Sequence, residues 1–366
     1  MRLIIYTFLI FSCFINRLNS ATIGYGYSYV MTDRQEFVYM GFLMGLKQHL
    51  NRPLGENSLF LKKSTAKNMM KPFHIAMELQ KNADPFIVGF ATSHEALMAA
   101  KAIKGKKKIF ISAVAKSSEL SKFGENVFSI NSSNEDTTLV ALNLVKKKLN
   151  LNNGIMITNP HNAFSSNLDS LYRKELKALE GLNVQTLFTD QMGNVDIKQL
   201  KYIVEQGAQF IIVNTYIRRS FGILEGLRKI NKNLPLITNS SWVIDDIEEV
   251  KRLVTDKSLD IYSFEVIDRT TKEYSHLSKL AKSEYGTTPV PHMVYGYDLG
   301  VVVADLINRT KGKLSYENIL MEIKKNSCFK MTSSGGLCLP KEGGNAIREV
   351  FIVKFSKGKG FIKVSE

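Results

Sequence analysis

Few residues of this chain have the types and spacing that catalysis or cofactor binding requires. Gly24 and Gly26 follow the first β-like run in the manner of a dinucleotide-binding loop, but Tyr29 stands where the third glycine of that motif belongs. Neither a Walker phosphate loop nor a Gly-x-Ser-x-Gly nucleophile elbow occurs. The histidines lack metal-ligand spacing; only His94 is worth noting, and its simplest reading is a helix-start residue without a special role. We therefore expect no enzyme, no metal site and no cofactor.

Two cysteines near the C-terminus indicate a candidate disulfide. Cys328 and Cys338 are the two that remain once the first 21 residues are set aside. In an oxidising compartment, two cysteines so close in sequence favour a disulfide that closes a small loop, and two separate thiols are the alternative. Two cysteines without a nearby histidine do not complete a tetrahedral zinc site.

The N-terminus has the pattern of a secretory signal peptide over residues 1–21. Arg2 supplies the positive charge, residues 3–15 are nearly all apolar, and Ser20-Ala21 is a small pair at which a signal peptidase can cut. The apolar run is shorter than the roughly 20 residues that span a bilayer. We therefore predict an exported protein, periplasmic or extracellular; an uncleaved anchor and a lipid-anchored form cleaved before Cys13 stay open.

The formal net charge of +15 raises the question of a nucleic-acid partner. The lysines are scattered, however, and the short runs at 106–108 and 146–148 fall at a helix end or a strand start, where solvated lysines are ordinary. Export also argues against nucleic acid, so we expect none to bind.

The elements that must position any site alternate between β-like runs and amphipathic helices, which is typical of α/β layers around a parallel sheet. The length of 366 residues suits two domains of ordinary size. Continuous apolar runs predict strands at 22–27, 59–62, 86–89, 108–111, 154–158, 184–188, 210–213, 236–238 and 261–264, with a terminal hairpin at 349–355 and 360–364. Apolar stripes at helical spacing predict helices at 66–81, 93–103, 136–149, 271–285, 292–308 and 316–325, and one opened by Asp196 as its N-cap.

Several motifs, in their order and spacing, resemble the type I periplasmic binding proteins of the leucine/isoleucine/valine-binding kind. Residues 84–93 resemble the family's strand and small-hydroxyl loop, and they lead into an alanine-rich helix at 96–100. Residues 110–113 resemble its next strand and serine loop. Tyr295 to Asp298 and residues 336–345 resemble its tyrosine–aspartate helix start and its closing glycine turn. The resemblance covers almost the whole chain after the signal.

The resemblance implies an α/β protein of two Rossmann-like lobes with a three-segment hinge, in which ligands bind beyond the carboxyl ends of the strands. Lobe 1 would comprise residues 22–131 plus 268–335, and lobe 2 residues 132–267 plus 336–366. The hinges would fall near 129–132, 265–268 and 334–336.

The same resemblance implies a function in transport. A monomer would capture a small polar ligand, an amino acid or a small carboxylate or amide, between its lobes, and deliver it to the membrane permease of an ABC transporter. A ligand-sensing module that reports to a membrane receptor or kinase has the same fold and is the alternative.

In lobe 1, the resemblance places four ligand-binding candidates. Thr92 and Ser93 match the hydroxyl loop, whose N–H groups at a helix start favour a carboxylate; the alternative is that they only cap the helix. Ser112 and Lys116 fall in the next pocket loop, where the family often has threonine in place of Lys116.

In lobe 2, the resemblance places four more ligand-binding candidates. Phe164 stands where an aromatic residue commonly covers the ligand, and Tyr216 follows the next strand in the same sense, although both are alternatively core residues. Ser240 and Ser241 follow the strand after that, beside the single tryptophan, Trp242, for which packing is the simpler role.

The sequence departs from the amino-acid-binding members of the family. These place a carboxylate near the Ser240 loop to pair with the ligand's ammonium group, whereas Asp245 is the nearest here. Lys116, Arg218 and Arg219 lie on cleft-side loops instead. Burying an ammonium group without a counter-charge is costly, so the sequence favours an anionic ligand without one, unless these long cationic side chains point to solvent.

Overall fold

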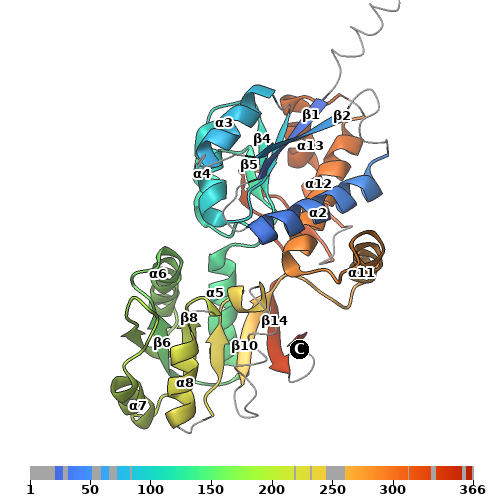
Figure 1. Cartoon of the computed structure of the whole chain (residues 1–366). Helices are drawn as coiled ribbons and strands as arrows, with labels where there is room; N and C mark the ends of the chain where they lie inside the picture. Colours follow the sequence, from blue (N-terminus) through green and yellow to red (C-terminus); the bar gives the residue numbers. More distant parts are fainter. Residues whose placement is uncertain are drawn as a thin grey trace, which may run out of the picture. The chain divides into compact units, whose positions relative to one another are not determined.

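The computed structural model divides the chain into two compact units, each described here by itself (Figure 1). Unit 1 comprises residues 1–132 and 269–348, and unit 2 comprises residues 133–268 and 349–366. Predictions on the signal peptide, Cys13, Arg218, Arg219 and Asp245 lie outside the described residues. Those residues are 21–27, 32–51, 59–65, 72–82, 85–217, 220–230, 233–244, 260–311, 313–330, 335–356 and 360–364.

Unit 1 is built on a six-stranded sheet in the order β13-β5-β4-β3-β1-β2, with every neighbouring pair parallel. Its central strands are continuous apolar runs with every residue buried, as a sheet covered on both faces requires. The strands are β1 (Ala21–Tyr27), β2 (Leu59–Thr65), β3 (Phe86–Gly89), β4 (Ile109–Ser112), β5 (Val127–Ser129) and β13 (Gly344–Asn345).

Helices cover both faces of this sheet. Figure 1 shows α3 and α4 on one side and α2 and α12 on the other. Thr92 caps α4 and Ser315 caps α13, each accepting a hydrogen bond from the backbone N–H three residues on. The helices are α2 (Thr32–His49), α3 (Pro72–Asn82), α4 (Ser93–Ile103), α11 (Lys272–Tyr285), α12 (Pro291–Arg309) and α13 (Tyr316–Lys325), with a 3₁₀ turn at Ser118–Phe123.

Helices α2 and α12 pack backbone against backbone through four glycines: Gly41 and Gly45 on α2, and Gly296 and Gly300 on α12. A Cβ added to any of them would meet a carbonyl oxygen of the other helix closer than real Cβ contacts occur; for Gly296 that oxygen belongs to Val38. This close approach lets two apolar helices, one of them buried over most of its length, share one side of the sheet.

Unit 2 is built on a seven-stranded sheet in the order β15-β14-β10-β9-β8-β6-β7. The five strands from β10 to β7 are parallel, while β14 and β15 add an antiparallel pair after the chain returns to the unit. The strands are β6 (Asn153–Thr158), β7 (Asn183–Phe188), β8 (Phe210–Asn214), β9 (Leu236–Thr238), β10 (Ile261–Glu265), β14 (Phe351–Ser356) and β15 (Gly360–Lys363).

Each face of the second sheet has its own core. One core joins α5 and α6 to Met156, Phe210 and Ile212, and the other joins α7 and α8 to Ile155 and Ile211. Asp196 caps α7 as predicted, accepting from the backbone N–H groups of the first turn. The helices are α5 (Asn134–Asn143), which continues as a π-helical turn over Leu144–Lys148, α6 (Ala163–Ala178), α7 (Ile197–Glu205), α8 (Phe221–Ile230) and α9 (Ser241–Ile244).

The α/β class with parallel-dominated sheets is confirmed, and the chain crosses between the units three times. The third crossing differs from the prediction. Residues 336–348, which the sequence analysis assigned to lobe 2 after a hinge at 334–336, belong to unit 1, and the chain crosses at 348–349.

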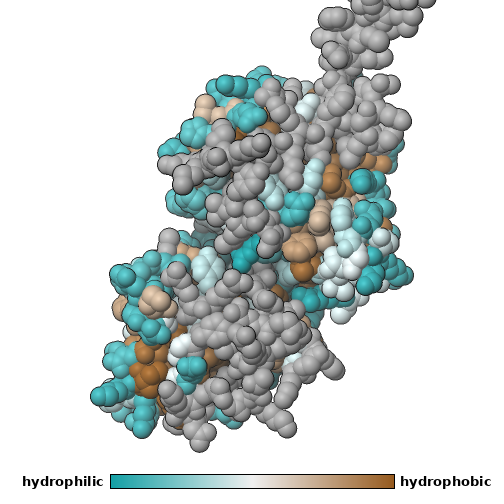
Figure 2. Space-filling model, viewed as in Figure 1, coloured by the Kyte–Doolittle hydropathy of each residue, from teal (hydrophilic) through white to brown (hydrophobic). Residues whose placement is uncertain are grey.

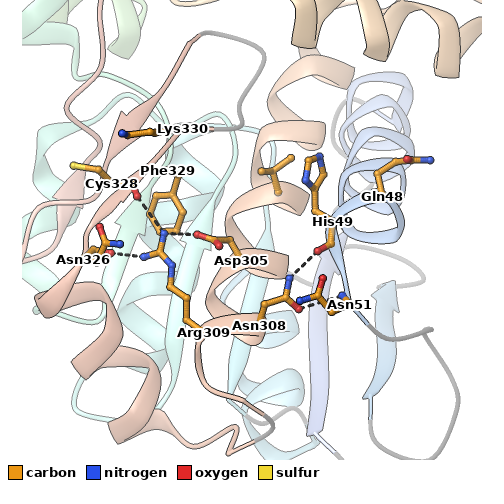
Figure 3. Close-up of a pocket in the computed structure, with 11 residues that line it drawn as sticks. Gln48, His49, Asn51, Asp305, Asn308, Arg309, Asn326, Cys328, Phe329 and Lys330 are labelled. Carbon is orange, nitrogen blue, oxygen red and sulfur yellow. Dashed lines mark hydrogen bonds and ion pairs between the residues drawn. The ribbon is translucent and has the colours of Figure 1, made fainter.

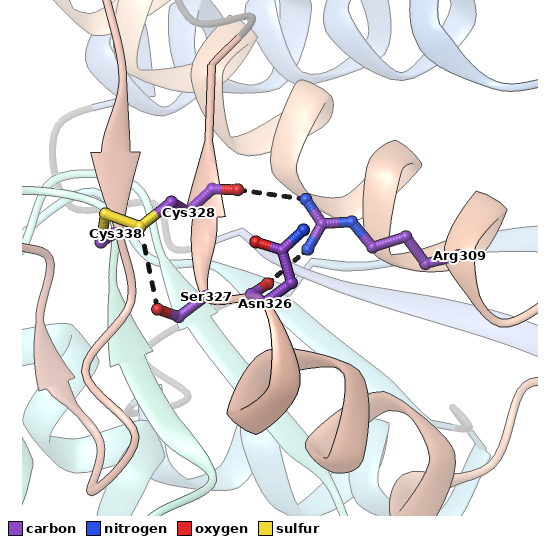
Figure 4. The surroundings of a disulfide bond; sticks show 5 residues. All are labelled: Arg309, Asn326, Ser327, Cys328 and Cys338. Atoms are coloured by element: carbon purple, nitrogen blue, oxygen red, sulfur yellow. Dashed lines mark hydrogen bonds between the residues drawn. A yellow bond between two sulfur atoms is a disulfide. The ribbon is translucent and has the colours of Figure 1, made fainter.

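The physical reason lies in short pairings that apolar patterns do not reveal. β13 hydrogen-bonds beside β5 as the edge of the unit 1 sheet. β11 (Cys328–Phe329) and β12 (Leu337–Cys338) form a two-stranded ribbon in which a disulfide joins Cys328 to Cys338 (Figure 4). Arg309 on α12 holds the ribbon, donating to the carbonyl oxygens of Asn326 and Cys328 and lying over the Phe329 ring.

On the face that Figure 2 shows, the described residues are mainly hydrophilic, with an apolar patch over the β6 region of unit 2. Phe188, the last residue of the edge strand β7, is 53% exposed. None of the helices within the described ranges is long and apolar enough to cross a membrane.

We expect Gly296→Ala to lower the free energy of unfolding by about 3 kcal/mol, because the new methyl group must push two helix backbones apart. Urea denaturation checks this value. Lys279→Ala on the exposed face of α11 is the control and should change it by less than about 0.5 kcal/mol. Equal stability of the two variants would contradict the close helix contact.

We also expect a pH dependence from His292, near the start of α12. Burial, reinforced by the charge of Arg34, lowers the pKa of His292 to about 3. Between that value and the unfolded pKa of about 6.5, the unfolded chain binds a proton that the folded chain does not, so stability falls as the pH falls. The loss is about 1.4 kcal/mol per pH unit. Urea titrations from pH 7 to pH 4 should show this slope reduced in His292→Gln; equal slopes in the wild-type protein and in His292→Gln would contradict it.

Candidate functional site

The carboxyl ends of β3 and β4 bring the four lobe 1 candidates together on unit 1. Thr92 Oγ1 accepts from Glu95 N and caps α4. Ser93 Oγ accepts from the backbone N–H of Lys116 at 3.0 Å, which ties the loop after β3 to the loop after β4. Lys116 itself is only 8% exposed. The N-terminus of α4 contributes positive potential at this edge.

Ser112 has a bracing role in the same loops. It is fully buried at the end of β4, where its hydroxyl donates to Phe90 O at 3.2 Å and accepts from Ala115 N at 3.3 Å. Both hydrogen bonds hold the backbone that carries Ser93 and Lys116. The geometry therefore supports Ser112 as a residue that positions the loops, whereas a direct contact with ligand stays a prediction.

The loop after β3 has an unusual backbone. Phe90 has a φ of 59°, in the left-handed region, and its ring lies so close to Gly26 that a Cβ there would collide with it. Gly26 thus allows β1 to pack closely against this loop, which explains that glycine without a nucleotide. Strained backbone of this kind clusters at functional loops.

The carboxyl ends of β6 and β8 bring Phe164 and Tyr216 together on unit 2. Their rings stack with centroids 4.6 Å apart and planes inclined by 19°. Ser165, next in α6, donates through its hydroxyl to Asn214 O at the end of β8, and Ser220 donates to Tyr216 O at 3.0 Å. These bonds fix both rings at the strand-end edge, half-buried.

Ser240 and Ser241 follow β9 at the same edge and are nearly buried. The hydroxyl and the backbone N–H of Ser241 both donate to Asn239 Oδ1, so this serine forms part of the turn into α9. Trp242 is fully buried, donates through Nε1 to Thr215 O at 3.0 Å and belongs to the unit 2 core. Packing is thus its role.

Sequence reasoning missed a set of asparagines at the strand ends. Asn239 is satisfied: its Nδ2 donates to Val213 O and Thr215 O, joining β9 to β8. Other strand-end asparagines keep buried amide atoms that make no hydrogen bond within the part of the chain that the structure describes; these are Asn131, Asn159, Asn214 and Asn345. Asn159, Asn214 and Asn239 each directly follow a predicted strand, which is their signal in the sequence. Asn131 and Asn345 lie at β5 and β13, two strands that the sequence analysis did not predict.

Glu265 was also missed, since the sequence analysis considered it only as a hinge residue. It ends β10 at the carboxyl edge of the unit 2 sheet and is 2% exposed. Its Oε1 accepts from Val266 N at 3.1 Å. A buried carboxylate at this edge bears directly on whether the ligand carries an ammonium group.

A buried ion pair stabilises unit 1 where the chain leaves it. Arg348 Nη2 and Asp298 Oδ2 are 3.1 Å apart with both side chains fully buried, and Arg348 Nη1 donates to Ile130 O at 2.9 Å. Arg348 is the last residue of unit 1, and Ile130 lies just before the first crossing. The pair therefore fixes two of the three crossing segments to α12.

A cavity of about 620 Å³ opens elsewhere on unit 1, where α2 and α12 end beside β11 (Figure 3). Polar groups that line the cavity interact with one another: Arg309 forms an ion pair with Asp305, and Asn308 Nδ2 donates to His49 O at 2.7 Å. Because α2 runs back from β1, this cavity lies toward the amino ends of the strands, away from the candidates. Across the described ranges, no His, Cys, Asp and Glu residues gather in a metal-binding group.

Comparison with known proteins accounts for this arrangement. A family model described as "Periplasmic binding protein" matches residues 76–360. No curated protein matches the sequence.

Solved structures share the fold at low sequence identity. A leucine-binding protein, LivK, from Thermotoga maritima is 15% identical over 94% of this chain and 98% of that one, with a TM-score of 0.75. LivJ from Streptococcus pneumoniae, in complex with isoleucine, is 16% identical over 94% and 100%, with a TM-score of 0.71. An ABC-transporter solute-binding protein from Rhodopseudomonas palustris, in complex with 3,4-dihydroxybenzoic acid, is 15% identical over 94% and 95%, with a TM-score of 0.73.

Proposed function

Because the chain belongs to the periplasmic binding protein family, we propose that it is the exported solute-binding protein of an ABC transporter and captures a small carboxylate between its two units. The observation that carries this proposal is Lys116, 8% exposed and joined through its backbone N–H to Ser93 at the start of α4. The protein holds its ligand for a membrane permease and does not convert it.

The unit 1 edge supports an anion on physical grounds. The first N–H groups of α4 are oriented toward its N-terminus, where a carboxylate is favoured by the helix dipole. Thr92 accepts the N–H of Glu95, which leaves the preceding N–H groups of the turn for a ligand. A charge-assisted hydrogen bond from Lys116 would add to this because little water surrounds the lysine.

The ligands of the similar structures agree in one respect. Isoleucine and 3,4-dihydroxybenzoic acid, in the LivJ and Rhodopseudomonas palustris complexes, both carry a carboxyl group, and only isoleucine also carries an ammonium group. The carboxylate is thus the shared chemistry, and the rest of the ligand is set by the unit 2 edge.

An ammonium group distinguishes amino-acid ligands from simple carboxylate ligands. Residues 214–217 and 239–244, which follow β8 and β9 within the described ranges, include neither Asp nor Glu. Glu265, at the end of β10, is the buried carboxylate of this edge. Because these described loop residues hold no carboxylate and Glu265 Oε1 already accepts from the Val266 N–H, we infer a ligand without an ammonium group. Direct comparison of matched compounds decides it: 4-methylpentanoate against leucine, and phenylacetate against phenylglycine.

We expect Lys116→Met to weaken binding of the carboxylate that binds best by about 10- to 100-fold, the loss of about 1.5–3 kcal/mol from a hydrogen bond to a charged group. Isothermal titration calorimetry measures it, after thermal-shift screening of the matched compounds. Lys101→Met, on the exposed last turn of α4, is the control. Unchanged affinity in Lys116→Met, or binding of leucine alone, would overturn the proposal of an ammonium-free carboxylate held by Lys116.

A further inference from the structure

We propose that Asn214 and Thr138, here called the Asn214 cluster, form a subsite on unit 2 that binds an uncharged hydroxyl or carboxamide group of the ligand. The inference rests on the proposed function and names the second group that the carboxylate ligand carries. Neither residue was among the candidates drawn from the sequence.

The cluster is polar, buried and unsatisfied. Asn214 and Thr138 are each 1% exposed. Both amide atoms of Asn214, Nδ2 and Oδ1, and the hydroxyl oxygen of Thr138 make no hydrogen bond among the described residues. Leaving such groups unsatisfied costs free energy, so a native protein retains them where something else supplies the partners.

The fold puts the two side chains on one face and at one edge of the sheet. Asn214 follows Phe210 and Ile212 on alternate positions of β8, so it faces the core that holds α5 and α6. Thr138 lies one helical turn before Ala141 and Leu142, which belong to that core. Because α5 starts at the carboxyl edge of the sheet, its first turns lie level with the end of β8.

Asn214 lies close to the ring pair of the candidate site. Ser165 at the start of α6 donates to the backbone oxygen of Asn214. Phe164 directly precedes Ser165, and Tyr216 lies two positions after Asn214. The rings of Phe164 and Tyr216 stack on one another. A ligand that contacts the rings would extend toward Asn214 with its far end.

The donor and acceptor balance selects the group that fits. Asn214 offers two N–H donors and a carbonyl acceptor, and Thr138 offers one of each. A hydroxyl or a primary amide on the ligand can both accept a hydrogen bond from these donors and donate one to these acceptors. A carboxylate would face the Asn214 carbonyl oxygen and bury a charge, and an ammonium group would face the Asn214 N–H groups, so both are rejected.

The first test needs no ligand. Asn214→Leu replaces the amide by an apolar group of similar shape, and we expect it to raise the melting temperature of the ligand-free chain by about 2 °C or more. Asn239→Leu is the matched control, because its amide is fully bonded at the end of the neighbouring strand, and it should lower the melting temperature. A fall in Asn214→Leu as large as the control's would show that Asn214 is structural, held by an ordered water, and would overturn the inference.

The second test uses matched carboxylates with and without the neutral group: benzoate, 4-hydroxybenzoate and 4-carbamoylbenzoate, and butanoate with 4-hydroxybutanoate. We expect the wild-type chain to bind the hydroxyl or amide member at least about tenfold more tightly, and Asn214→Leu to bind the members of each set equally. Carboxylates that bind without this preference, or a preference that survives in Asn214→Leu, would overturn the inference and leave the proposed function standing. If none of the carboxylates binds the wild-type chain, both proposals fail.

Discussion

The geometry of parallel strands governs this molecule. Parallel strands end at one edge of their sheet, and the backbone groups and loops at that edge require polar side chains that a core does not. In both units the buried serines, threonines and asparagines gather there, as Ser112 and Asn131 do in unit 1 and Asn214 and Asn239 in unit 2. The candidate site is a consequence of that requirement, since the same edge that needs polar residues for its own loops can also offer them to a ligand.

Two kinds of contact keep the edges in place. In unit 1, glycines on α2 and α12 allow the helices to touch backbone to backbone, and the buried pair of Arg348 and Asp298 fixes the crossing segments. In unit 2, hydrogen bonds of Ser165 and Asn239 connect the loops of neighbouring strands. Each edge is thus preorganised within its own unit, which reduces the entropy that a ligand must overcome.

The sequence predicted most elements well because their physical signals are local. Apolar runs locate β3 and β8, and the N-cap Asp196 marks where α7 begins. The third crossing was misplaced because β13 has two residues and is held by pairing with β5, which no local pattern encodes. At the candidate site, residue types pointed to loops that the structure gathers at one edge of each sheet. Ser112 braces the backbone there, and Asn214 and Thr138 were not among the candidates. Which hydroxyl or amide is satisfied internally depends on partners far away in sequence.

The central claim is that the two polar edges act together on one ligand. Small-angle X-ray scattering of the chain with and without a saturating carboxylate, chosen by calorimetry, tests it most directly. The account predicts a smaller radius of gyration with ligand, as the two units close on it. An unchanged radius at full occupancy would contradict the account, because the ligand would then be held by one unit alone.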